Sequence, residues 1–353
     1  MSDLHTKLYM DSSFLNDKHL RKFFKYFFKK VLILSVSLLL LTVETSFGST
    51  WGFWAHRRIN RLAVFSLPPE MQYFYKKHID YITENAVNPD RRRYAVVGEA
   101  ERHFIDLDVY GDSALKILPK VWQAAVKKLG EDSLRKHGIV PWYIQTAAYQ
   151  LTDAFKDKDS KRILRISADL GHYVADSNVP LHTTRNYNGQ LTHQEGIHAF
   201  WESRLPELYA AEYDLWIGKA VYIENLTESI WSSVDRAHLA SDSVFLFEKQ
   251  LSEAFEPDKK YSYELRNNVL SRTYSQDFSL QYHSLLKGQV ERQMKASISM
   301  VSDLWYTCWI NAGQPDLSTL NDYIPDEKEK KAEAAEQRSW LQRLLHIRSE
   351  SDN

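Results

Sequence analysis

Apolar side chains recur every three or four residues along most of this chain, which is the spacing of one face of an α-helix. The clearest example runs from residue 161 to residue 177, where Ile163, Ile166, Leu170 and Val174 form the apolar rows. No strand-like alternation of useful length and no internal repeat interrupts the pattern. It predicts an all-α fold with helices at residues 70–84, 119–136, 141–155, 161–177 and 196–205, and three or four more beyond residue 222, the longest at 275–310.

The residues that break helices support this prediction. Only 12 glycines and 10 prolines occur among 353 residues, and such scarcity favours long helices over strands and turns. Residues 88–90 predict a turn, residues 185–194 predict a loop, and Pro206 predicts the end of a helix or a kink. With 44% hydrophobic and 13% aromatic residues, the chain can build a large core.

The first 50 residues have the order of a secretory signal peptide. Four lysines between residues 22 and 30 precede an apolar run at 31–43, and a mostly small-residue stretch follows at 46–50. The apolar run is short for a membrane span, and an N-terminal anchor helix is the alternative. These features predict an exported protein, periplasmic or secreted, with a main domain at residues 51–325.

Charge and cysteine content narrow the classes of function. Without residues 1–50 the chain carries 38 basic and 42 acidic residues, a net charge of −4, which argues against binding polyanions by electrostatics alone. The charge-dense residues 326–353 predict a solvated helical tail. The single cysteine, Cys308, excludes an intramolecular disulfide, and its aromatic neighbours predict a buried, inert thiol.

Two histidine–carboxylate pairs carry the candidate chemistry. His172 and Asp176 lie four residues apart, as do His198 and Glu202, so each pair shares one helix face. Imidazole and carboxylate groups at that spacing suit a divalent cation such as zinc. One such pair alone is more often a helix-surface pair. Two of them together, with His182 just beyond the proline that ends the first helix, predict a metal site.

Together with four residues upstream, these five residues resemble the pattern of the superfamily of zinc-dependent phospholipases C and S1/P1 nucleases. The pattern covers residues 51–205, about half of the chain without its first 50 residues, and its positions appear in the expected order: Trp51, His56, Asp90, His103, His172, Asp176, His182, His198 and Glu202.

The resemblance implies a single multi-helical domain around three zinc ions. It assigns one ion to Asp90, His103, His172 and Asp176, and a second to His182, His198 and Glu202. A third ion would bind the main-chain amine and carbonyl of Trp51 together with His56 and Asp176, which requires cleavage directly before Trp51. The implied activity is phosphodiester hydrolysis by metal-activated water, with Asp90 orienting or deprotonating that water. Glu101 and Asp106 are candidates for fixing the imidazoles.

The sequence leaves two classes of substrate open, one for each branch of the superfamily. Glu202 as the last ligand and the short loop before His198 favour a phospholipase C-like enzyme, whereas the close spacing of Trp51 and His56 favours a single-strand nuclease. The expected partner is therefore a phospholipid or nucleic-acid phosphodiester, with contact to a membrane surface in the first case, and no protein partner is inferred. A non-catalytic exported protein stabilised by zinc is the third hypothesis.

Overall fold

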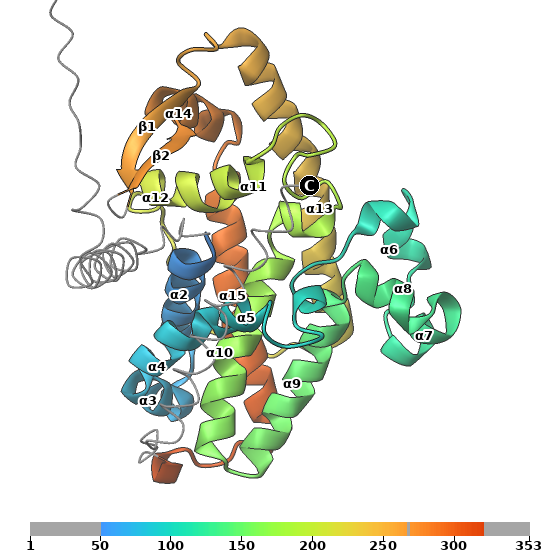
Figure 1. Cartoon of the computed structure of the whole chain (residues 1–353). Coiled ribbons are helices and arrows are strands. Elements are labelled where there is room, and N and C mark those ends of the chain that lie inside the picture. The colour runs from blue at the N-terminus through green and yellow to red at the C-terminus, as the bar shows by residue number, and fades with distance from the viewer. Residues whose placement is uncertain (1–50, 267–268, 321–353) are drawn as a thin grey trace, which may run out of the picture. The chain divides into compact units, whose positions relative to one another are not determined.

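The computed structural model describes residues 51–266 and 269–320, and it confirms the all-α class (Figure 1). Residues 51–264 and 272–320 belong to one compact unit, which contains all the candidate ligands described below, and residues 265–271 fall outside it. The predicted signal peptide and the tail at 326–353 lie outside the described residues, so both stay predictions. Of the helices that are described, none combines the length and apolar character needed to span a membrane.

Helices provide nearly all of the regular structure. The helices are α2 (Trp51–Ala63), α3 (Pro69–Lys77), α4 (Ile79–Glu84), α5 (Asn88–Arg92), α6 (Ala114–Ile117), α7 (Trp122–Leu129), α8 (Glu131–Lys136), α9 (Val140–Lys156), α10 (Ser160–Ser177), α11 (Ile197–Ala199), α12 (Leu205–Tyr209), α13 (Leu226–Ala254), α14 (Gln276–Leu285) and α15 (Gln289–Asn311). Short 3-10 turns at Ala100–His103 and Pro180–Thr183 and a π-helical turn at Phe200–Arg204 carry candidate ligands. Two strands, β1 (Tyr261–Arg266) and β2 (Val269–Tyr274), pair with each other.

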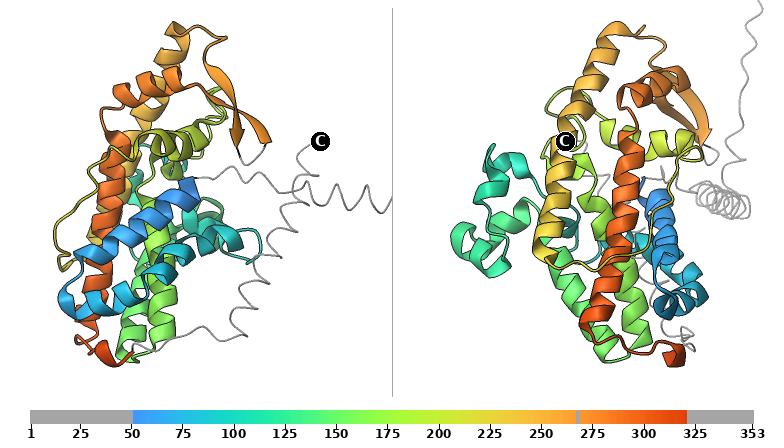
Figure 2. Two further views of the ribbon diagram at one scale, coloured as in Figure 1. Left: turned by 90° about the vertical axis from the view of Figure 1, so that its left-hand side faces the viewer. Right: turned by 180° about the vertical axis from the view of Figure 1, so that it is seen from behind.

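Helix α10 lies at the centre of the core. It packs beside α9 and α15, and α2 packs on both α10 and α15 (Figures 1 and 2). The Asp159 carboxylate caps its start by accepting a hydrogen bond from the Arg162 N–H at 3.0 Å. Every residue from Leu170 to Ser177 is buried, so other elements surround the C-terminal end of this helix. The predicted helix at 161–177 is confirmed, and so is the one at 141–155.

A glycine allows α2 to cross α10 closely. The Asn60 side chain of α2 donates a hydrogen bond to the Ala168 carbonyl of α10 at 3.0 Å. A Cβ atom added at Gly171 would lie 2.0 Å from Asn60 Oδ1, closer than any real contact. The glycine therefore sets the distance between the helices that carry His56 and His172.

Three predicted helices are each divided in two. The helix expected at 70–84 breaks at His78, where the backbone leaves the helical region. The one expected at 119–136 breaks at Gly130, with φ of 80°. The one expected at 275–310 breaks at Lys287 and Gly288, with φ of 48° and 73°. Residues with positive φ, as at the second and third breaks, end a helix. At all three breaks the apolar periodicity continues on either side and conceals the short interruption.

The hairpin of β1 and β2 was not predicted from the sequence. Its apolar members do not mark a core face. Tyr263, Leu265 and Leu270 are exposed, whereas Tyr274 is buried. A short strand pair that faces solvent lacks the alternation of buried apolar residues by which strands are recognised.

Pro206 does not end its helix. A π-helical turn at Phe200–Arg204 precedes it, and α12 continues to Tyr209. A proline inside an α-helix clashes with the carbonyl four residues earlier, which here belongs to Glu202. The widened turn moves that carbonyl away and also changes the direction in which the Glu202 side chain projects.

Residues 88–90 differ from the prediction as well, because they open the short helix α5 instead of a turn.

The lone cysteine is buried, as predicted. Cys308 is 2% exposed and its thiol donates to the Ala148 carbonyl at 3.3 Å. Burial raises the pKa of the thiol to about 12, so it is protonated and unreactive at neutral pH.

Candidate metal centre

Seven separate segments bring eight of the nine predicted ligands together. They contribute His56 from α2, Asp90 from α5, His103 from the turn at 100–103, His172 and Asp176 from α10, His182 from the turn at 180–183, His198 from α11 and Glu202 from the π-helical turn. The ninth, Trp51, begins α2, but its side chain lies outside the described part of the chain. Its role as a ligand stays a prediction, as does the metal ligation of the other eight.

The first group of ligand atoms has four members. His172 Nε2 and His103 Nδ1 lie 3.0 Å apart, and each is 3.6 Å from Asp90 Oδ1. Asp176 Oδ2 lies 2.9 Å from His103 Nδ1 and 3.3 Å from His172 Nε2. Zinc–nitrogen and zinc–oxygen bonds of about 2.0–2.2 Å place the ligand atoms of a tetrahedral site about 3.3–3.5 Å apart. The four residues therefore fit one zinc ion.

The second group contains His182, His198 and Glu202. The Glu202 carboxylate lies between the two rings, with Oε1 3.1 Å from His182 Nε2 and Oε2 2.9 Å from His198 Nε2. The rings themselves face each other with centroids 5.1 Å apart. His198 is the most exposed of the three, with 24% of its side chain in solvent. Two imidazoles and one carboxylate leave a further coordination position toward that open side.

The third group joins α2 to α10. His56 Nε2 lies 3.4 Å from Asp176 Oδ1, and the His56 ring stacks on that of His172 with centroids 3.9 Å apart. His56 Nδ1 is buried without a hydrogen-bond partner in the described structure. His172 is the third side chain of this group but also belongs to the first, and the sequence predicts that Trp51 supplies the further ligands.

Asp176 links all three groups. Its Oδ2 faces His103 and His172, and its Oδ1 faces His56 at 3.4 Å and His182 Nδ1 at 3.5 Å. Burial opposes ionisation of this 2% exposed side chain, yet the imidazoles of His172 and His182 hold the pKa of Asp176 well below its usual range. A single ionised carboxylate in the interior thus contacts all four of these histidines.

Backbone carbonyls orient three of the histidines. The Nδ1 atoms of His172, His182 and His198 each face a carbonyl, at 2.9 Å from Ala86, 2.6 Å from His103 and 3.1 Å from Tyr187. Each Nδ1 must carry a proton and donate it, so Nε2 is the nitrogen that would bind a metal. Metal-binding histidines are held in this way by a second hydrogen bond.

The two carboxylates expected to fix the imidazoles have other partners. Glu101 pairs with Arg135 at 3.1 Å, and Asp106 faces His137 Nδ1 at 3.5 Å. The prediction was wrong because the rings donate to backbone carbonyls instead, and the sequence does not show which carbonyl a ring will face. The carboxylate that does lie near a ligand is Glu99, fully buried, with Oε1 3.8 Å from His103 Nε2.

Glu99 is itself held firmly. Arg92 Nε donates to it at 3.2 Å, Arg102 Nη1 donates at 2.9 Å, and the Tyr173 hydroxyl also donates. Burial would raise the pKa of Glu99, but Arg92 and Tyr173 lower it. The buried carboxylate is therefore ionised and lies on the side of His103 that faces away from the cluster.

The charge state of the second group makes cation binding depend on pH. Burial alone would lower the pKa of His182, but Asp176 and Glu202 raise it to about 9. Burial alone would raise the pKa of Glu202, but His198 and His182 lower it to about 2. Without a metal, the cluster thus keeps a proton beside its carboxylates at neutral pH. A cation that binds there displaces this proton, so its affinity increases with pH.

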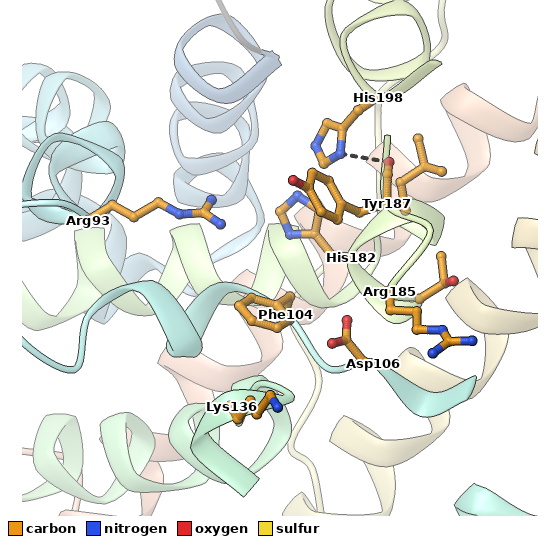
Figure 3. A pocket seen from close by; sticks show the side chains of 10 residues that line it. Arg93, Phe104, Asp106, Lys136, His182, Arg185, Tyr187 and His198 are labelled. Carbon is orange, nitrogen blue, oxygen red and sulfur yellow. Dashed lines mark hydrogen bonds between the residues drawn. The ribbon is translucent and has the colours of Figure 1, made fainter. Parts of the chain in front are cut away.

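A pocket of about 230 Å³ opens beside the second group (Figure 3). Its lining includes His182 and His198, the aromatic rings of Phe104 and Tyr187, and three basic side chains, Arg93, Lys136 and Arg185. Arg93 extends toward His182 and Tyr187 in Figure 3. Sequence reasoning missed Arg93, although it follows Asp90 by three residues and so lies near the same helix face.

Comparisons with known proteins add little to this picture. No protein-family model matches the chain, and no curated protein matches it. Among solved structures, it is similar to the alpha-toxin of Clostridium perfringens from the avian strain SWCP, at 14% identity and a TM-score of 0.42. The similarity covers 79% of this chain and 67% of that chain. Likeness at this level supports no functional conclusion, so membership of the superfamily stays a prediction.

Replacing Glu202 with glutamine is expected to release one metal ion and leave the others bound. The amide keeps the shape but removes the charge that the two imidazoles share, and the first group does not contain Glu202. Elemental analysis of the purified variant measures the loss, with the exposed Glu253→Gln as the control. His182→Ala should release the same ion, and unchanged metal content in both variants would contradict the assignment.

Proposed function

We propose that this protein is a zinc-dependent phosphodiesterase. The observation that supports this most strongly is that three groups of ligand atoms lie next to one another, beside a pocket lined by basic side chains. The buried carboxylate of Asp176 belongs to two of these groups and contacts the Nδ1 side of His182 in the other. Structural zinc sites are closed by four protein ligands, whereas catalytic sites keep one position open. His182, His198 and Glu202 offer three ligands, and the two histidines line the pocket, as a catalytic site requires.

Bound zinc ions would act as Lewis acids that activate water for attack on phosphorus. The protein's own residues determine what such a centre attracts. The three carboxylates of Asp90, Asp176 and Glu202 cannot neutralise three divalent cations, so the loaded centre keeps a positive charge. That charge favours a phosphodiester anion over a neutral ester as substrate.

Arg93 adds a guanidinium to this end of the pocket. Among the described residues, no carboxylate pairs with it and no hydrogen bond involves its side chain. Its charge nevertheless acts on two ligands, because it opposes protonation of both His103 and His182. A half-buried guanidinium without a partner is suited to bind two phosphate oxygens at once.

Asp90 is the carboxylate best placed to handle the proton of the attacking water. Its side chain is 21% exposed, whereas those of Asp176 and Glu202 are 3% and 8% exposed. It faces two imidazole nitrogens at 3.6 Å with one oxygen, Oδ1. In this proposal that oxygen is a ligand, and the carboxylate also accepts the proton as the water attacks.

Asp90→Asn is expected to reduce turnover far more than stability. Loss of a general base typically lowers kcat by about 10²–10⁴-fold, whereas a partly exposed, isosteric change alters the folding free energy by less than about 1 kcal/mol. Turnover of bis(p-nitrophenyl) phosphate and the thermal midpoint, measured on the same preparation, separate the two effects. Metal content must be determined in parallel, and full turnover by the variant would exclude the proposed role.

The count of three ions depends on the N-terminus. A free α-amino group has a pKa of about 7.7–8 and can bind a metal once deprotonated, whereas an amide nitrogen in an uncleaved chain cannot. The proposal therefore includes export and cleavage directly before Trp51. N-terminal sequencing of the exported protein tests this, because any residue ahead of Trp51 removes the third site.

We place a phospholipase C-like activity first, because Glu202 is the last predicted ligand and the loop before His198 is short. A single-strand nuclease is the second candidate, favoured by one feature of the pocket. The rings of Phe104 and Tyr187 lie among the three basic side chains, and aromatic and cationic groups together bind bases and phosphates. A non-catalytic zinc-stabilised protein is the remaining hypothesis, and it does not account for the open side of the second group.

The decisive experiment combines metal content with turnover. The exported protein should contain three zinc ions per chain and should hydrolyse bis(p-nitrophenyl) phosphate. Phosphatidylcholine and single-stranded DNA, assayed side by side, then separate the two candidate substrates. Tightly held metal without turnover of any of the three substrates would favour the non-catalytic hypothesis.

A further inference from the structure

The pocket beside the second group extends away from the proposed metals. His198 and Lys136 appear at opposite ends of it in Figure 3, with Phe104 between them, and Arg185 lies beyond Asp106. The pocket thus has one end near the candidate ligands and another end whose charged groups the proposed hydrolysis does not use. Its volume of about 230 Å³ is below the roughly 300–1,000 Å³ of pockets for drug-sized ligands, so the far end suits a small group.

The far end has an excess of positive charge. Lys136 is the last residue of α8, is exposed, and has no ion-pair or hydrogen-bond partner among the described residues. Arg185 is paired only loosely, with Nε 3.9 Å from Asp108, and its side chain is 65% exposed, so its guanidinium is free to turn. Both cations can therefore bind an anion without breaking a strong existing contact.

The segment that carries Arg185 is nevertheless fixed in place. Asp108 accepts hydrogen bonds from the Arg185 backbone N–H at 3.1 Å and from the Thr184 hydroxyl at 3.0 Å. Gln190 donates to the Arg185 carbonyl at 2.6 Å. The backbone at this end of the pocket is thus held by three hydrogen bonds while the charged tip of Arg185 is not.

Asp106 is the acid among the lining residues, and it does not cancel this charge. Its carboxylate faces His137 Nδ1 at 3.5 Å and not Lys136 or Arg185. Burial raises the pKa of Asp106, and His137 and Arg185 act against that rise. Lys136 has no partner among the described residues and Arg185 is only loosely paired with Asp108, so both cations can turn toward an anion.

We propose that Lys136 and Arg185 bind a second phosphate of the substrate, next to the phosphodiester that is hydrolysed. The inference rests on the proposed phosphodiesterase function and makes it more specific. A substrate with a phosphate on each side of the pocket is bound at both ends, whereas a zwitterionic group such as phosphocholine brings its positive nitrogen toward two cations. The net charge of −4 that the chain carries without its first 50 residues does not oppose this, because the positive groups are local to the pocket.

Matched pairs of small substrates test the proposal. The first pair is a thymidine dinucleotide with and without a 5′-phosphate, and the second is glycerophosphoinositol with and without a phosphate on the inositol ring. The zinc-loaded protein should show a lower KM for the phosphorylated member of at least one pair, by about tenfold for two exposed charge-assisted contacts. The pair that shows the difference identifies whether a nucleotide or a lipid headgroup supplies the phosphate.

The variant Lys136→Ala/Arg185→Ala should abolish that difference by raising KM for the phosphorylated substrate while leaving kcat nearly unchanged. Turnover of bis(p-nitrophenyl) phosphate, which has no second phosphate, should not change. The control Lys127→Ala/Arg165→Ala removes the same charges from exposed positions outside the pocket lining and should behave as the parent protein. Equal KM within both pairs for the parent protein, or an unaltered preference in the pocket variant, would overturn the proposal.

Failure of the proposed function gives a different result. If the parent protein hydrolyses no diester, binding of inorganic phosphate to it, measured by titration calorimetry, replaces KM as the readout. Phosphate binding that is lost in the pocket variant but kept in the control supports the subsite, and binding that is the same in all three proteins overturns it. Weakening of that binding at high salt is expected, because the two side chains are exposed.

Discussion

Asp176→Ala is expected to remove at least two metal ions, the largest loss that a single ligand replacement can cause here. The carboxylate contacts His103 and His172 through one oxygen and His56 and His182 through the other. An ion present at 100 times its dissociation constant stabilises a folded protein by about 2.7 kcal/mol, so the loss of two ions should cost about 5 kcal/mol. Elemental analysis and thermal unfolding with excess zinc measure both effects, and turnover should fall below detection.

A second, partly buried acid on the same helix provides the control. Asp169 lies in α10 too and pairs with Arg92 at 2.9 Å, but it contacts none of the candidate ligands. Asp169→Ala should destabilise the protein and keep its metals. If both variants lost the same number of ions, the loss would report general disruption of α10, and the central place of Asp176 would be refuted.

Gly171→Ala is expected to destabilise the protein by up to about 2 kcal/mol, although alanine is the better helix former. Helix propensity favours alanine over glycine by about 1 kcal/mol. Against this, the new Cβ would lie 2.0 Å from Asn60 Oδ1, and overpacking of a tight core costs about 1–3 kcal/mol or more. The clash should prevail and push α2 away from α10, which separates His56 from His172.

A double-mutant cycle identifies the cause. Asn60→Ala removes the obstructing side chain, together with its hydrogen bond to the Ala168 carbonyl. In that background Gly171→Ala should lower the free energy of unfolding by at least about 1 kcal/mol less than in the parent protein. The effects of substitutions at two residues in contact are not additive. Strict additivity in chemical denaturation would show that the two side chains do not collide.

The sequence predicts the parts of the centre that depend on helical spacing. His172 and Asp176 approach to 3.3 Å, and His198 and Glu202 to 2.9 Å, as residues four apart on one helix face should. The helices at 141–155 and 161–177 are confirmed for the same reason, because a long apolar periodicity outweighs local exceptions. The all-α class follows from those long segments.

What the sequence could not predict depends on contacts between distant segments. The Ile105 N–H donates to the His182 carbonyl at 2.9 Å while the His182 ring donates to the His103 carbonyl, and this pairing across 79 positions brings two candidate groups together. Arg93 was missed because its significance lies in the pocket that it enters. The breaks at Gly130 and Gly288 were missed because one left-handed residue leaves the apolar pattern on both sides intact.

The carbonyls of Ala86, His103 and Tyr187 have a consequence for how this centre can vary. Every amino acid has a carbonyl, so a replacement of Ala86 or Tyr187 leaves the acceptor in place and need not alter the orientation of the ring that donates to it, whereas His103 is itself a candidate ligand. Sequence drift around the histidines is therefore tolerated where the main-chain path is kept. An inserted or deleted residue between 183 and 188 shifts the Tyr187 carbonyl and should turn the His198 ring, an effect that no single side-chain exchange there reproduces.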